Sequence, residues 1–176
     1  MGYALNELAN LPIDDEVNFY IFVVNGQFRE PLYEMMQQNF ISIARSIGSN
    51  AVIAVGTDPK AFTDQVARKY AGDSSRAAFL QRSLPAFLIT NAHPDRLTKE
   101  SVRLICDAEG RFRGWQNFFT LLSGYVRGES NEFLNKFERT ESFIDAANKV
   151  LNIRPGMFGI SVNINELFDR WRKRTA

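Results

Sequence analysis

The apolar run at residues 17–24 strongly constrains the fold of this sequence. It reads Val-Asn-Phe-Tyr-Ile-Phe-Val-Val and stops at the turn-forming pair Asn25-Gly26. A short run that is β-branched or aromatic almost throughout is typical of a strand buried on both faces. Because such a strand needs helices on both sides of its sheet, the sequence predicts an α/β domain.

Three further runs predict the other strands of this sheet. They cover residues 51–55, 84–90 and 102–106, and the run 84–90 carries Pro85 near its start. Helical spacing of apolar residues follows the first two strands, beginning at Pro31 and at Pro59. Since proline cannot donate a ladder hydrogen bond, we expect Pro85 to open its strand, with a cis peptide bond as one option. We expect that strand at the centre of the sheet.

Two stretches at the margins of this pattern are less distinctive. Apolar residues within 3–11 recur at helical spacing and predict a short helix docked at an edge. Residues 102–106 predict a fourth strand, and a helix through 98–106 is the competing interpretation.

The pattern changes near Gly128. Residues 115–126 have a wide apolar helical face, and residues 132–151 predict a further helix, followed by an extended segment at 158–164 and a last helix from Asn165. We therefore divide the chain into an α/β domain, residues 1–128, and a mainly helical extension, residues 129–176.

The order of the predicted elements, β-α-β-α-β-β-α, resembles the thioredoxin-like superfamily. The segment Leu84-Pro85-Ala86-Phe87-Leu88-Ile89 resembles the part of that family in which a cis-proline opens the third core strand. Residues 19–24, followed by Pro31 and an amphipathic helix, resemble its first strand and helix. The resemblance covers residues 17–126 and implies a three-layer domain with a mixed sheet and a structural role for Pro85.

The family's redox motif has no counterpart here. Its oxidoreductases carry Cys-x-x-Cys, or one cysteine, at the start of the first helix, where this chain reads Asn-Gly-Gln-Phe-Arg-Glu-Pro over residues 25–31. The single thiol, Cys106, lies within an apolar run, so we expect it to be buried and inert. The resemblance then implies a redox-inactive relative used for binding or as a scaffold.

The only histidine suggests an alternative function. His93 lies in a predicted loop directly after a strand, and Arg76, Arg82 and Arg103 could converge there to bind a phosphate or carboxylate. The alternative is therefore an enzyme or sensor for a small anionic ligand. The ordinary interpretation makes His93 a turn residue and the arginines solvated surface.

Composition excludes several other classes. A net charge of +1 gives no electrostatic case for nucleic acid, and no Gly-rich phosphate loop or Gly-x-Ser-x-Gly motif occurs. One cysteine and one histidine leave no metal cluster, so we expect neither metal nor cofactor. The first fifteen residues lack a signal-like pattern and no run is long enough to span a membrane, so we expect a cytoplasmic protein.

Aromatic residues are dense after Gly128, outside the predicted core domain. Aromatic side chains are enriched at protein interfaces, so we expect this extension to contact a protein partner or a second copy. The predicted interface residues are Phe133, Phe137, Phe143, Phe158, Phe168 and Trp171. The basic residues around Trp171 leave a contact with nucleic acid or membrane as a weaker option. The function favoured by the sequence is a non-catalytic protein-binding or assembly module.

Overall fold

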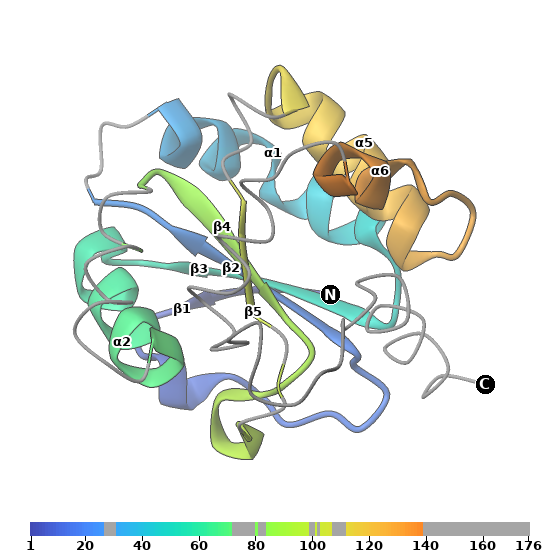
Figure 1. The fold of residues 1–176 in the computed structure, drawn as a ribbon. Helices are drawn as coiled ribbons and strands as arrows, with labels where there is room; N and C mark the ends of the chain where they lie inside the picture. The colour runs from blue at the N-terminus through green and yellow to red at the C-terminus, as the bar shows by residue number, and fades with distance from the viewer. Residues whose placement is uncertain are drawn as a thin grey trace, which may run out of the picture.

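The computed structural model describes residues 1–26, 31–71, 80, 84–98, 101, 103–106 and 112–138, and these form one mixed sheet with helices on both faces (Figure 1). The strands are β1 (Gly2–Leu5), β2 (Phe19–Val24), β3 (Ala51–Gly56), β4 (Ala86–Thr90) and β5 (Arg103–Cys106). The helices are α1 (Pro31–Ile47), α2 (Pro59–Ala71), α5 (Trp115–Val126) and α6 (Glu132–Glu138), with short 3₁₀ turns η1 (Leu8–Asn10) and η2 (Pro94–Arg96).

The five strands follow the order β1-β3-β2-β4-β5. Strands β1, β3 and β2 are parallel, whereas β4 runs antiparallel to β2, and β5 antiparallel to β4. In this register Ile21 of β2 lies beside Ile53 of β3 and Ile89 of β4. Strand β2 is therefore the middle strand, and the prediction that β4 would be central is wrong by one position.

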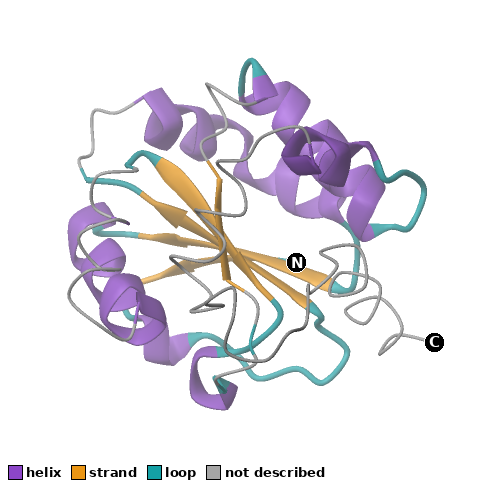
Figure 2. Cartoon of the chain, viewed as in Figure 1, coloured by secondary structure: helices purple, strands orange, loops and turns teal. Residues whose placement is uncertain are grey.

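Alternate residues of β2 enter two separate cores. Phe19, Ile21 and Val23 pack with α1, α5 and α6 on one face of the sheet. Tyr20 and Phe22 pack on the other face with α2 and the N-terminal segment. Figure 2 shows the sheet enclosed between these two layers of helices. The fold is thus a mixed α/β sheet covered on both sides, as the run 17–24 predicted.

Helix α1 illustrates how the sequence produces the predicted helices. Pro31 occupies the first turn, where its missing N–H would have had no helical partner. Leu32, Met36 and Ile43 then recur on one side and are buried against the sheet. The helix ends at Ile47, followed by Gly48 with φ of +115°, a conformation that favours glycine.

Helix α6 turns back onto the same domain. The chain reverses at Gly128, where φ is +75°, and the Glu129 N–H donates to the Gly124 carbonyl at 2.8 Å. Phe133 then stacks on Phe112 and Tyr125, with ring centroids 5.3 and 5.7 Å away. Phe133, which the sequence analysis assigned to an interface, is 1% exposed and lies in the core of this chain.

The predicted helix within residues 3–11 is wrong, because Gly2–Leu5 forms an edge strand parallel to β3 and only η1 is helical. A short isolated helix has little intrinsic stability, whereas the open edge of β3 offers a full hydrogen-bond ladder. Gly2 permits this pairing, since a Cβ there would lie 2.6 Å from Ala44 Cβ.

The other structural predictions have mixed outcomes. The strand within 102–106 is confirmed, and its helical alternative is wrong. Pro85 directly precedes β4, and the Leu84–Pro85 peptide bond is cis. The predicted helix 132–151 begins as α6, and its part beyond residue 138, the extended segment 158–164 and the final helix from Asn165 lie outside the described residues. Within the described ranges, no helix combines the length and the apolar character needed to cross a membrane.

Two glycines provide a test of this packing. A Cβ on Gly56 would lie 2.2 Å from Phe62 Cβ and 2.8 Å from the Asp58 carbonyl oxygen, so Gly56→Ala should lower the free energy of unfolding by about 3 kcal/mol. A Cβ on Gly124, inside α5, would meet Ser130 Cβ at an ordinary 3.7 Å. Gly124→Ala should therefore raise that free energy by about 1 kcal/mol through helix propensity. Urea unfolding of both variants measures the two effects, and equal shifts would contradict the packing described.

Candidate functional site

The loop after β4 holds the most polar buried cluster among the described residues. Strand β4 is antiparallel to β2, and Thr90 pairs with Tyr20 near the start of β2. The loop 91–95 therefore lies at the amino end of β2. Helix α1 starts beyond the carboxyl end of β2, so the loop and the start of α1 lie at opposite ends of this strand. Ligand sites of open α/β sheets lie at the carboxyl ends of the parallel strands, so this loop lies at the other end from such sites.

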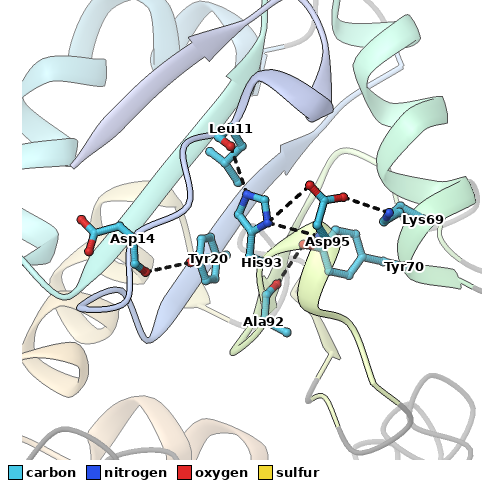
Figure 3. Close-up of polar contacts among 8 residues, drawn as sticks. All are labelled: Leu11, Asp14, Tyr20, Lys69, Tyr70, Ala92, His93 and Asp95. Carbon is cyan, nitrogen blue, oxygen red and sulfur yellow. Dashed lines mark hydrogen bonds and ion pairs between the residues drawn. The ribbon is translucent and has the colours of Figure 1, made fainter.

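At this end of the sheet, both ring nitrogens of His93 form hydrogen bonds with backbone groups (Figure 3). Its Nδ1 accepts from the Asp95 N–H at 3.2 Å, which leaves the proton on Nε2 to be donated to the Leu11 carbonyl at 3.0 Å. This pattern assigns the neutral Nε2–H tautomer. With a side chain only 2% exposed, His93 offers a substrate neither a lone pair nor a proton.

Aromatic and charged side chains enclose the histidine. The Tyr20 ring meets it edge-on, with centroids 5.8 Å apart, and the Tyr70 hydroxyl donates to the Ala92 carbonyl at 3.0 Å. The Asp95 carboxylate lies 3.9 Å from Nδ1 but pairs with Lys69 at 3.2 Å on the surface. In Figure 3 these groups converge from the N-terminal segment, β2, α2 and the loop itself. The cluster ties four parts of the chain together.

The pKa values of the two tyrosines in this cluster are both raised. Burial raises the pKa of the Tyr70 phenol well above its ordinary value of 10.0. Burial also raises the pKa of Tyr20, although the nearby Arg96 guanidinium opposes the shift. Both phenols therefore remain protonated donors at neutral pH, and neither is prepared to act as a base.

The predicted arginine site is only partly placed. Arg103 opens β5 opposite Thr90, is half-buried, and donates from Nη2 to the Thr98 carbonyl at 3.1 Å. Arg76 and Arg82 lie outside the described residues. The structure thus places His93 and Arg103 at the same end of the strands. Both ring nitrogens of the histidine are hydrogen-bonded to backbone groups.

At the opposite end of the strands lies a pair of hydrogen bonds that the sequence did not reveal. The Asn25 N–H donates to Thr63 Oγ1 at 2.8 Å, and the Thr63 hydroxyl donates back to the Asn25 carbonyl, also at 2.8 Å. This reciprocal pair joins the end of β2 to α2. It lies beside the start of β4, because Val24 pairs with Ala86. A threonine on the apolar side of the predicted helix 59–70 was the available signal.

The side chain of Cys106 lies in the apolar core and not in either polar cluster. Its residue pairs with Phe87, and it belongs to the apolar cluster beneath α1 and α5 with 0% exposure. A buried thiol in apolar surroundings is inert. Across the described ranges, no three His, Cys, Asp or Glu side chains are arranged to hold a metal ion.

Comparisons with known proteins return no relative. No family model matches the chain, and neither the curated proteins nor the solved structures contain a match. Functional inference therefore depends on the geometry described above.

Variants of His93 separate its two bonds. His93→Ala should lower the free energy of unfolding by about 3 kcal/mol, because it removes two buried hydrogen bonds. His93→Asn can still accept from the Asp95 N–H, and His93→Gln can still donate to the Leu11 carbonyl, so each should lose only about half as much. Urea unfolding of the three variants measures these losses. Asn and Gln variants as unstable as the Ala variant would show that the ring itself, not its bonds, is required.

Alkaline unfolding tests the environment of Tyr70. Its folded pKa lies above the unfolded value of 10.0, so its contribution to stability is complete below pH 10 and is lost as the pH rises above it. The wild type should lose up to about 1.4 kcal/mol per pH unit from this group. Tyr70→Phe should start about 1 kcal/mol less stable, through the lost bond to Ala92, and then show a shallower decline above pH 10. Unfolding free energies measured at several pH values would contradict the assignment if the two slopes were equal.

Proposed function

We propose that the protein is a non-catalytic binding or assembly module of the cytoplasm, and that residues 139–176 contact its partner. The supporting observation is that helices within residues 31–138 already cover both faces of the sheet. The proposal therefore assigns the apolar side chains of 139–176 to a partner contact.

The described surface supports the same inference. Its exposed large apolar residues are Met1, Ile13 and Ile41, which do not adjoin in sequence. Three such residues do not form the broad apolar face that a tail with several aromatic residues would require. Phe143, Phe158, Phe168 and Trp171 are therefore the candidates for contact with another protein.

The proposal includes a thioredoxin-like origin without redox chemistry. The strand order β1-β3-β2-β4-β5 and the antiparallel β4 support that origin. The buried position of Cys106, the only cysteine in the chain, supports the absence of thiol chemistry. A single buried thiol also suits a reducing compartment.

The engagement of His93 favours binding over catalysis. A general base needs an accessible nitrogen within reach of a substrate proton. Both nitrogens of His93 are occupied by backbone groups inside the fold. The alternative, an anionic-ligand enzyme at this loop, has no comparable observation in its favour.

Substitutions in the tail of the full-length chain test the proposal. Phe168→Ser combined with Trp171→Ser should change the free energy of unfolding by less than about 0.5 kcal/mol, because the proposal assigns these side chains to a partner contact. The same variant should lose the protein that the wild type captures from its native host, as measured by quantitative mass spectrometry.

Phe133→Ser is the matched control. Phe133 is an aromatic residue in the described core, so its loss should cost about 4 kcal/mol. A tail variant destabilised to a similar degree would show that residues 139–176 complete the fold, and would overturn the proposal. A stable tail variant that captures the same proteins as the wild type would also overturn it.

A further inference from the structure

Strand β1 ends the sheet on one side with unpaired backbone groups. The Met1 carbonyl accepts from the Ile53 N–H and the Leu5 carbonyl from the Thr57 N–H, both at 2.9 Å. Backbone groups alternate along a strand, so Met1, Tyr3 and Leu5 face β3, whereas Gly2 and Ala4 direct their N–H and C=O groups outward. No hydrogen bond to another described residue occupies these outward groups. Two donors and two acceptors therefore form an open strand edge.

This edge lacks the usual protection against pairing. Natural edge strands carry lysine, proline or a bulge that prevents another strand from adding. Residues 1–6 contain no charged side chain and no proline, and Gly2 and Ala4 are small and exposed. The Met1 ammonium donates inward to the Ala51 carbonyl at 2.6 Å, so the outward side of the edge carries no charged side chain.

Exposed apolar side chains lie next to the same edge. Helix α1 contacts β1 through Phe40 and Ala44, which lie against Gly2. Ile41 precedes Ala44 by one helical turn on this side of α1 and is 66% exposed. Met1, at the start of the edge, is 37% exposed. These are two of the three exposed large apolar residues of the described surface.

We propose that the β1 edge pairs with the β1 edge of a second copy of this chain, in antiparallel orientation about a two-fold axis. The outward residues Gly2 and Ala4 are two positions apart. With Tyr3 on the axis, Gly2 of each copy opposes Ala4 of the other, and both pairs exchange two hydrogen bonds. This register uses every outward group of both strands and joins the two five-stranded sheets into one continuous sheet.

Self-pairing accounts for the composition of the edge better than another peptide does. Two identical edges without charged side chains meet without the like-charge repulsion that opposed charged side chains would cause. The two Tyr3 side chains oppose each other at a position without mutual hydrogen bonds, where cross-strand side chains are closest.

This surface belongs to the described domain and does not depend on residues 139–176. It is thus separate from the partner contact in the proposed function. A tail variant such as Phe168→Ser with Trp171→Ser should leave β1 pairing unchanged, so the two proposals can fail independently.

Disulfide trapping in the full-length chain tests the register. The Tyr3→Cys pair would have Cα atoms about 4.5 Å apart on the axis, within disulfide range. The matched Ala4→Cys pair would be about 8 Å apart, which is beyond it. Mild oxidation should give a covalent dimer from Tyr3→Cys and little from Ala4→Cys, while Cys106 stays buried. Equal trapping of both variants, or trapping of neither, would overturn the proposed pairing.

Complementary charges provide a second test by light scattering. The wild type should have twice the 20.1 kDa mass of one chain. Tyr3→Lys and Tyr3→Glu should each be monomeric, because like charges meet on the axis, and an equimolar mixture should recover the dimer. Ala4→Pro, which removes an outward N–H and no internal bond, should be a folded monomer by circular dichroism. A wild-type monomer, or a dimer unaffected by all three variants, would overturn the proposal, as would capture of a foreign extended peptide in place of the second copy.

Discussion

The fold depends on the double pairing of β2. This strand bonds to β3 on one edge and β4 on the other, and all six of its residues are buried. Its alternate residues supply both cores, so a shift of one position would exchange their side chains between two differently shaped cavities. The register of one strand therefore determines how α1 and α2 can pack.

The reversal of direction at β4 gives the sheet two chemically different ends. One end joins Asn25 to Thr63 close to the start of β4, and the other joins His93 to Leu11. At both ends the buried polar atoms bond to backbone of a distant segment. Polar residues that would suggest chemistry in a sequence thus join distant segments of the chain here.

The sequence predicted the elements much better than their partners. Apolar periodicity located β2, α1, β3 and α2, because a helix or strand buried on one or both faces must carry that pattern. It failed at Gly2–Leu5, where pairing with β3 overrides a local helical spacing. It also could not show that His93 bonds to Leu11, 82 positions away, since such contacts depend on the direction of β4. Phe133 was misassigned because the chain reverses at Gly128 and returns this residue to the core, which local spacing does not show.

The segment between β1 and β2 has a consequence for the order of folding. The Leu8 N–H donates to Gln65 Oε1, and the Leu11 carbonyl accepts from His93, so its attachments lie 57 and 82 positions further along the chain. Those partners must be in place before the segment gains any of these bonds, and closing such long loops carries an entropic cost. We therefore expect this early part of the sequence to be among the last to become ordered. In native-state hydrogen exchange it should belong to a unit that opens below the global unfolding free energy.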